Sequence, residues 1–200
     1  MTEYSIRPAR ESDANEILDI YAPYIEKTAI TFECRVPDPD SFRRRIRDIA
    51  KDYPYLVCLL DDRIVGYAYA HRQMERAAYG WNAELSVYLS PDHQRNGIGR
   101  TLYTALVEIL ELQNIRNLYA GITLPNPKSQ GLHRALGFRD LGVYHLTGYK
   151  FGSWRDVVWM EKRIGTDEEP PKPFLPIHRL DWEIVAGILK RCEERLNTFK

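Results

Sequence analysis

Apolar side chains recur at helical spacing in two stretches near the N-terminus, and each stretch predicts a helix. The first covers residues 11–25, where we expect Ser12 to act as the N-cap and Pro23 to end or bend the helix. The second covers residues 37–51. The side chains predicted to face inward are Ile17, Leu18, Tyr21, Ile25, Phe42, Ile46 and Ile49.

Short runs of apolar or alternating residues predict the strands. Residues 55–60 and 63–71 lie on either side of a short acidic turn, so we expect a hairpin of buried strands. Residues 82–90 alternate, which places Glu84 on one face of its strand and Leu85 on the other. Further strands are predicted over residues 4–9, 117–123, 138–151 and 154–164.

Two more amphipathic stretches, residues 98–110 and 126–137, predict helices between the later strands. The apolar stripe of the first consists of Ile98, Leu102, Leu106, Ile109 and Leu110. After the first short strand, the chain thus has two helices, then antiparallel strands, and finally alternating strands and helices. This order predicts an α/β fold with a mixed sheet covered on both faces.

The chain changes character after Gly165. The stretch "TDEEPPKPFLP" is acidic and proline-rich, which predicts an extended linker. A last helical pattern follows, and we expect this helix to dock on the main domain or on a partner subunit, because an isolated helix of this length is marginally stable. Its apolar positions are Trp182, Val185, Ile188, Leu189 and Leu196. We therefore divide the chain into a main domain (1–164), a linker (165–180) and a C-terminal helical extension (181–200).

Composition narrows the possible partners. Lys plus Arg and Asp plus Glu number 28 each, so no overall basic excess favours a nucleic acid or a membrane surface. No apolar run is long enough to span a bilayer and no signal core precedes the first strand, which predicts a cytoplasmic protein. The widely spaced Cys34, Cys58 and Cys192 fit free thiols, and no ligand spacing supports a metal site.

The most informative stretch is "QRNGIG", residues 94–99, between a predicted strand and a predicted helix. A dinucleotide fingerprint needs a third glycine where this chain has Leu102, and a Walker loop needs a Lys that is absent. A helix that starts near Gly97 would still present free N–H groups and a positive dipole end, which suit a pyrophosphate. The alternative is a glycine-rich turn without a ligand.

The surrounding motifs decide between these alternatives. "QRNGIG" resembles the pyrophosphate-binding signature of the GCN5-related N-acetyltransferases (GNAT), and a second signature of that family follows in the correct order. Its positions are Asn126, Ser129, His133, Gly137 and Phe138. The resemblance implies a GNAT fold, with a mixed central sheet of about six to seven strands flanked by helices. The C-terminal helix would be an addition to that fold.

Several stretches resemble the phosphinothricin acetyltransferase subfamily more closely, among them "TFE", "ERAAYGW", "ELSVYLSPDHQRNGIGRTLY" and "GYKFGSWRDVVWM". The resemblance covers residues 4–163 and implies direct acetyl transfer from acetyl-CoA to the α-amine of a small amino-acid-like substrate in a ternary complex. The residues that it assigns to acetyl-CoA are Val87, Tyr88, Leu89, Arg95, Asn96, Gly97, Ile98, Gly99, Arg100, Asn126 and Ser129.

The resemblance also suggests two catalytic residues. Glu84 matches the proposed general base, which is needed because an α-ammonium ion is not a nucleophile. A salt bridge at a strand edge is the alternative for Glu84. His133 stands where many relatives have a Tyr that is proposed to protonate the leaving thiolate. A buried or capping histidine is the equally weighted alternative for His133.

The resemblance also assigns residues to the acceptor site, with one departure from the subfamily. Arg76 and Tyr79 match residues that bind the acid groups of the amino-acid substrate, and Phe32 matches an apolar wall of the same pocket. Met74 departs from the subfamily, which usually has a second basic residue there. This departure disfavours phosphinothricin and favours a methionine sulfone or sulfoximine. Arg72 lies on the same strand face and is a possible substitute.

Two other functions compete with this one. The acceptor is alternatively a polyamine, an aminoglycoside or a protein N-terminus, although Arg76 suits an anionic substrate. Outside enzymes, the chain is alternatively a CoA-binding interaction module. Members of the subfamily are commonly homodimers, and the aromatic segment "YKFGSWRDVVWM" is a candidate for the interface.

Overall fold

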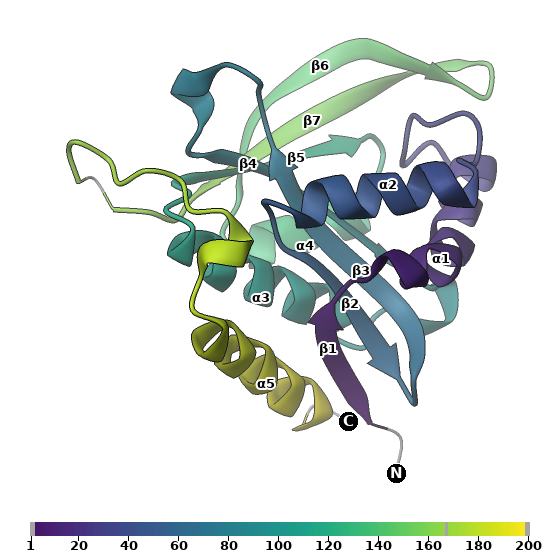
Figure 1. Cartoon of the computed structure of the whole chain (residues 1–200). Helices are drawn as coiled ribbons and strands as arrows, with labels where there is room; N and C mark the ends of the chain where they lie inside the picture. The colour runs from purple at the N-terminus through teal and green to yellow at the C-terminus, as the bar shows by residue number, and fades with distance from the viewer. Residues whose placement is uncertain (1–2, 167, 199–200) are drawn as a thin grey trace.

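Seven strands form one mixed sheet in the order β1-β2-β3-β4-β5-β7-β6 (Figure 1). The computed structural model describes residues 3–166 and 168–198. The strands are β1 (Tyr4–Pro8), β2 (Tyr55–Leu60), β3 (Arg63–Arg72), β4 (Asn82–Leu89), β5 (Asn117–Thr123), β6 (Arg139–Lys150) and β7 (Ser153–Arg163). All neighbouring strands are antiparallel except β4 and β5. The predicted mixed α/β sheet is confirmed.

The helices lie on both faces of the sheet (Figure 1). They are α1 (Ala14–Lys27), α2 (Pro39–Ala50), α3 (Ile98–Leu112), α4 (Pro127–Ala135) and α5 (Trp182–Thr198), with short 3-10 turns at Glu11–Asp13, Ala77–Tyr79, Pro91–His93 and Ile177–Arg179. Within the described residues, no helix is long and apolar enough to cross a membrane.

The predicted hairpin joins β2 and β3 through a two-residue turn. Asp61 and Asp62 adopt positive φ angles of 48° and 67°, which short polar side chains tolerate and a tight hairpin turn requires. Alternation along β2 then sends Leu56 and Cys58 to one face of the sheet and Val57 to the other. One strand thereby supplies both cores.

α1 and α2 cover the first face. Ile17, Ile25 and Phe42 are almost fully buried there against the side chains of β2 and β3. A row of tyrosines runs across this face, and Tyr67 stacks on Tyr55 and on Tyr88 at centroid separations of 5.9 and 5.3 Å. Stacked tyrosine rings thus extend across β2, β3 and β4 on this face of the sheet.

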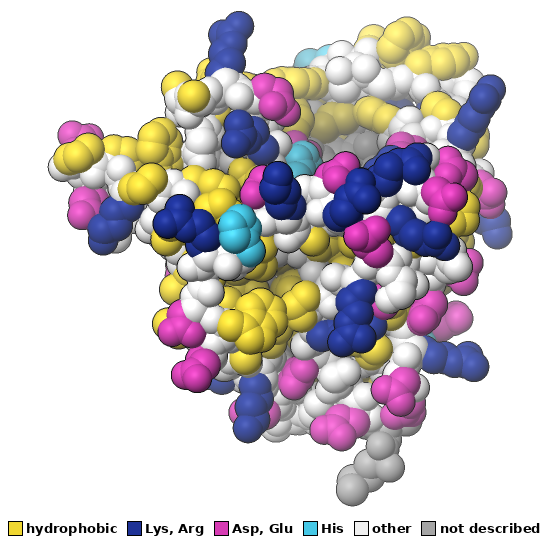
Figure 2. All heavy atoms as spheres, viewed as in Figure 1, with side chains coloured by type: hydrophobic (Ala, Val, Ile, Leu, Met, Phe, Trp, Pro, Cys, Tyr) yellow, Lys and Arg dark blue, Asp and Glu magenta, His cyan; other side chains and the backbone are white. Residues whose placement is uncertain are grey.

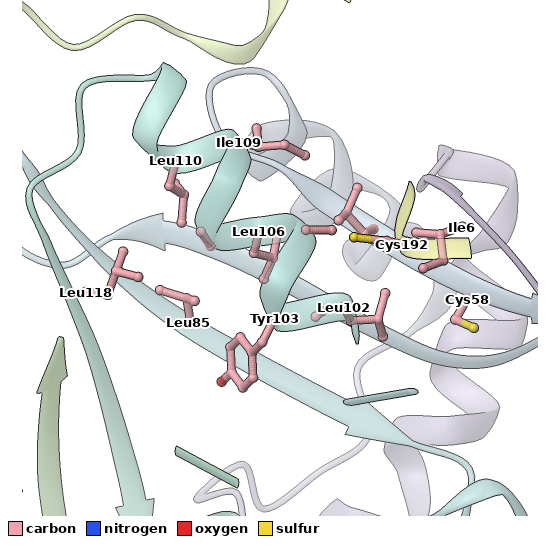
Figure 3. Packing of buried hydrophobic residues seen from close by; sticks show 14 of the residues in the cluster. Ile6, Cys58, Leu85, Leu102, Tyr103, Leu106, Ile109, Leu110, Leu118 and Cys192 are labelled. Atoms are coloured by element: carbon pink, nitrogen blue, oxygen red, sulfur yellow. The ribbon is translucent and has the colours of Figure 1, made fainter. Parts of the chain in front are cut away.

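α3 lies centrally on the second face, and its apolar stripe is completely buried, as predicted (Figure 3). α5 packs beside α3 and β1 and contributes Val185, Ile188 and Leu196 to the same core. It therefore docks on the main domain, one of the two predicted arrangements. Trp182 is an exception to the predicted inward stripe, because it lies at the first turn with 51% of its surface exposed.

One predicted detail of the first helix is wrong, and one of the two alternatives for Pro23 is excluded. Ser12 is not the N-cap, because it lies within a 3-10 turn and Asp13 precedes the helix. Pro23 does not end the helix, which continues to Lys27. Pro lacks the N–H that would bond to the carbonyl of Asp19, but Asp19 is solvent-exposed and its carbonyl can bond to water.

The described residues of the acidic, proline-rich segment after Gly165 form no helix or strand apart from the turn at Ile177–Arg179, yet the segment contacts the main domain. The buried Gln113 donates hydrogen bonds from its amide nitrogen to the carbonyls of Asp52 (2.7 Å) and Leu175 (2.8 Å). Trp81 donates its indole N–H to the carbonyl of Lys172 at 2.7 Å. These contacts lead the chain across the molecule to the start of α5.

Candidate active site

The two central strands separate immediately after Glu84. β4 pairs with β5 in parallel over only three residues, 82–84 opposite 117–119, whereas its other edge pairs with β3 as far as Leu89. The edge of residues 85–89 that faces β5 therefore has no strand partner within the described residues. Backbone N–H and C=O groups on such an edge can pair with an extended ligand that is added like another strand.

A cavity of about 420 Å³ lies along this edge. Its lining brings together most of the residues expected to bind a cofactor: Val87, Leu89, Arg95, Gly97, Ile98, Gly99, Arg100, Asn126 and Ser129. Tyr88 is different, because its side chain lies on the opposite face in the tyrosine row and only its backbone belongs to the edge. The structure thus gathers residues from β4, the glycine loop and α4 around one space.

The glycine loop presents its backbone at the start of α3. Arg95 and Gly97 both adopt positive φ angles, of 68° and 80°, and Gly97 is the N-cap of the helix without any side-chain cap. The N–H groups of the first turn are consequently left for a ligand, at the positive end of the helix dipole. Ile98 is fully buried and anchors the loop, while Arg95 and Arg100 are exposed at its rim. This geometry suits a phosphate group.

α4 begins beside the glycine loop. The side chain of Asn126 accepts a hydrogen bond from the N–H of Ser129 at 3.1 Å, and Pro127 is the first helical residue, as the sequence predicts. Lys128 donates to the side-chain oxygen of Gln94 at 3.0 Å and so links α4 to the loop. Asn126 and Ser129 therefore line the cavity and also stabilise the helix start.

His133 is buried below this helix start, with 2% of its surface exposed. Its Nδ1 lies 2.8 Å from the carbonyl of Ser129, which requires an N–H there, so Nε2 is the acceptor for the hydroxyl of Tyr103 at 3.2 Å. The ring is also packed edge-to-face against Phe138. Burial lowers the pKa of the His133 imidazole, and the bond to Ser129 only partly offsets this. These contacts hold a neutral ring in one orientation.

Glu84 lies at the point where the strands separate. It pairs across the strands with His71 and points to the face that carries the tyrosine row, next to Tyr69. Burial raises the pKa of the Glu84 carboxyl above its ordinary value, and the nearby His71 partly opposes this rise. No hydrogen bond to this carboxylate comes from the described residues. A half-buried carboxylate with a raised pKa is suited to accept a proton near neutral pH.

The residues expected to bind the acceptor lie on two exposed loops outside the cavity. Arg76 precedes the 3-10 turn between β3 and β4 and Tyr79 is the last residue of that turn, and Met74 lies before both with 45% exposure. Phe32 lies on another loop, with its ring directly against Gly148 of β6. Arg76 and Tyr79 therefore lie on the loop that leads to the Glu84 end of β4, whereas Phe32 lies against β6.

A model of the acetyltransferase (GNAT) domain matches residues 6–159, which run from β1 into β7. The chain belongs to the GNAT acetyltransferase family. The family resemblance deduced from the two motifs is thereby confirmed, as is the GNAT fold. The match ends before the acidic segment and α5, which consequently are additions outside the matched domain.

Known GNAT proteins resemble the chain over most of its length. It is 36% identical over 175 residues to a phosphinothricin N-acetyltransferase of Streptomyces viridochromogenes, which covers 88% of this chain and 95% of the relative. It is 30% identical to an L-methionine sulfoximine/L-methionine sulfone acetyltransferase of Salmonella typhimurium (83% and 98% covered). A GNAT phosphinothricin acetyltransferase of Sinorhizobium meliloti, solved with acetyl-CoA, superposes with a TM-score of 0.79 at 34% identity (86% and 93% covered). The protein is accordingly an N-acetyltransferase.

Some site residues of this GNAT protein escape sequence reasoning. Tyr24 of α1 lines the cavity and donates its hydroxyl to the carbonyl of Leu89 at 2.7 Å. Neither family motif assigns a role to Tyr103, yet its hydroxyl forms a hydrogen bond with His133. Neither tyrosine belongs to the apolar stripes predicted for these helices, and helical spacing gives no sign of what a tyrosine hydroxyl contacts.

Proposed function

We propose that the protein transfers the acetyl group of acetyl-CoA directly to the α-amine of a small amino-acid-like substrate. The observation that carries this proposal is the separation of β4 from β5 at Glu84. It puts a proton-accepting carboxylate at one end of an unpaired strand edge, and the phosphate-suited loop at Gly97 lies at the other end. A thioester held along this edge would bring its acyl end towards Glu84.

The residues of the cavity fit acetyl-CoA in the expected roles. The backbone of residues 85–89 would pair with the pantetheine arm, and a backbone N–H of this edge would donate to the oxyanion of the tetrahedral intermediate. The free N–H groups after Gly97 would bind the pyrophosphate. Gly99 is buried against Leu89 and Leu132, so a larger residue there would fill the cavity.

Glu84 would act as the general base. The reaction needs the neutral amine, so a proton must leave the ammonium ion of the acceptor before or during attack. The apolar surroundings that raise the pKa of Glu84 bring it closer to neutral pH, which makes the carboxylate a better proton acceptor there. Water can relay the proton where the carboxylate does not reach the amine directly.

Direct transfer in a ternary complex is supported by the cysteines. Burial raises the pKa of Cys58 to about 12 and that of Cys192 to about 11, so both remain unreactive thiols at neutral pH. Cys34 is exposed on the loop that carries Phe32. We expect Cys34→Ser to retain turnover and the kinetics to be sequential. Ping-pong kinetics that Cys34→Ser abolishes would instead show an acetyl-cysteine intermediate.

For the acceptor, we propose an amino acid whose carboxylate is bound by Arg76. Its guanidinium makes no ion pair with any described residue and lies just before the strand of Glu84. Met74 supplies no charge for a phosphinate, which favours a sulfone or sulfoximine side chain. An acetyl-CoA consumption screen over phosphinothricin, methionine sulfoximine, methionine sulfone and a polyamine tests this order. Polyamine as the preferred substrate would contradict it.

We also propose that the protein forms a homodimer through the β6–β7 arm. Figure 2 shows hydrophobic side chains gathered along this arm. Those with more than half of their surface exposed are Leu141, Tyr144, Leu146, Tyr149, Phe151 and Trp154. A contiguous exposed apolar surface of this kind marks an association site. Sedimentation should give a dimer, and Trp154→Glu should shift it to a monomer; a monomeric wild type at micromolar concentration would exclude the dimer.

We place the protein in the cytoplasm. The support is that all three cysteines are free in the structure, the state that a reducing compartment maintains. Alkylation of thiols in freshly lysed cells, followed by mass spectrometry, should find them reduced. Oxidised forms in the majority of molecules would contradict this location.

A further inference from the structure

A second and larger cavity, of about 900 Å³, adjoins the first on the other side of the glycine loop. Arg95, Gly97 and Arg100 line both cavities. The far wall of the second cavity comes from β1 and from α5, which contribute Tyr4, Cys192, Arg195 and Leu196. The C-terminal helix lies outside the matched GNAT domain, and it therefore forms one side of the cavity next to the glycine loop.

The charges around this second cavity have one sign. Its lining contains three arginines, Arg95, Arg100 and Arg195, and no Asp or Glu. None of the three forms an ion pair with a carboxylate within residues 3–166 and 168–198. Thr101 and Thr104 of α3 also line the cavity, although both hydroxyls donate to carbonyls of their own helix. A space lined by three unpaired guanidinium groups fits a phosphorylated ligand.

The position of Arg195 is fixed by the docking of α5. Leu196 is 2% exposed and its side chain lies beside Gly97, so the helix supports the loop from below. Arg191 forms an ion pair with Glu108 of α3 at 2.9 Å. Asn197 exchanges hydrogen bonds of 2.9 Å with both the N–H and the carbonyl of Tyr4 on β1. The buried Leu196 and the hydrogen bonds of Asn197 hold Arg195 against the same loop that carries Arg95 and Arg100, whereas the ion pair of Arg191 is solvent-exposed and contributes little.

We propose that Arg195 binds the 3′-phosphate of the CoA nucleotide, so that the C-terminal helix completes the donor site. This proposal rests on the proposed function. CoA carries its pantetheine on one side of the pyrophosphate and its 3′-phosphorylated nucleoside on the other. With pantetheine along residues 85–89 and the pyrophosphate on the loop shared by both cavities, the nucleoside enters the larger cavity. Arg195 on the far wall then meets its remaining phosphate.

Calorimetric binding of acetyl-CoA and of 3′-dephospho-acetyl-CoA tests the proposal, and neither titration needs an acceptor amine. Wild type should bind acetyl-CoA about tenfold more tightly than the dephospho form, a difference of about 1.4 kcal/mol. Arg195→Ala should lose most of this preference by weakening acetyl-CoA alone, and Arg195→Lys should keep part of it. Arg191→Ala is the matched control on the same helix, because it removes an arginine that contacts Glu108 and lies outside the cavity.

The outcomes separate the roles clearly. If Arg195→Ala weakens both ligands equally, or if Arg191→Ala removes the preference to the same extent, α5 acts on the fold and the proposal is wrong. An unchanged preference in Arg195→Ala also overturns it. If wild type binds neither ligand, the proposed function fails together with this proposal. If the preference behaves as expected while every amino-acid acceptor fails, only the acceptor part of the proposed function is lost.

Discussion

Replacing Glu84 with Gln removes the proposed general base and leaves the shape of the side chain almost unchanged. Glu84 is half-buried between its strand neighbours Ala83 and Leu85, and both of these are buried in the core on the opposite face. No hydrogen bond from a described residue depends on its charge. The substitution should therefore act on proton transfer and leave the acetyl-CoA cavity, which Glu84 does not line, intact.

The expected loss follows from the role. A positioned general base contributes about 10²–10⁴-fold to a rate. This corresponds to about 2.7–5.5 kcal/mol of transition-state stabilisation, at about 1.36 kcal/mol for each factor of ten. Wild-type kcat/KM for the amine should rise with pH through the raised pKa of Glu84, and this limb should be missing from the pH profile of the variant.

Steady-state kinetics over a pH series, together with calorimetric binding of acetyl-CoA, measures both effects. Glu111→Gln is the matched control, because burial also raises the pKa of Glu111 but it lies on the last turn of α3, outside the cavity. An unchanged kcat in Glu84→Gln would contradict the role of Glu84 as the general base. So would a loss of turnover that merely follows a loss of acetyl-CoA binding.

The same substitution should stabilise the folded state. The pKa of Glu84 is raised in the folded protein, so its contribution to stability is present below the unfolded pKa and is lost as pH rises through the folded pKa. Ionised Glu84 is therefore a cost at neutral pH that Gln does not carry. Thermal unfolding should give Glu84→Gln a higher Tm than wild type at pH 7, and the difference should shrink towards the ordinary Glu pKa of about 4.3.

The remaining predictions concern the loop and the helices that support it. Gly97→Ala should weaken acetyl-CoA binding and lower the free energy of unfolding by about 1–2 kcal/mol, because an Ala side chain disfavours the φ of 80° at this position. An unchanged acetyl-CoA affinity by calorimetry together with an unchanged free energy of unfolding by denaturation would contradict this. Leu196→Ala should cost about 2–5 kcal/mol by denaturation, whereas the half-exposed Ile184→Ala on the same helix should cost under about 0.5 kcal/mol. Tyr103→Phe removes the partner of His133 Nε2 and should cost about 1 kcal/mol with kcat retained; a large loss of kcat at unchanged stability would instead assign the pair to proton transfer.

Much of the fold is predictable because local periodicity and burial coincide in this chain. The apolar stripe of α3 is predicted correctly, since every side chain predicted to face inward is buried against the sheet. Pro23 does not end its helix, and the residue whose carbonyl loses its N–H partner there, Asp19, is exposed to solvent. Trp182 misleads because a helical pattern does not show where the neighbouring surface ends.

The candidate site divides in the same way. The family resemblance suggests Glu84 and the Gly97 loop from sequence, because both lie within one contiguous strand–loop–helix unit that carries the motif. Tyr24 and Arg195 cannot, because they come to the loop from α1 and from α5 only through tertiary packing. The buried state of His133 was one of two predicted alternatives, and choosing between them requires its contact with Tyr103.

The central claim is acetyl transfer to the α-amine of an amino acid, and analysis of the product tests it most directly. Purified protein should be incubated with acetyl-CoA and methionine sulfoximine, with free CoA thiol and acetylated amine quantified together by colour reaction and mass spectrometry. Wild type should form equal amounts of both products, and Glu84→Gln should form almost none of either. Release of CoA without an acetylated amine, or equal product from the variant, would contradict it.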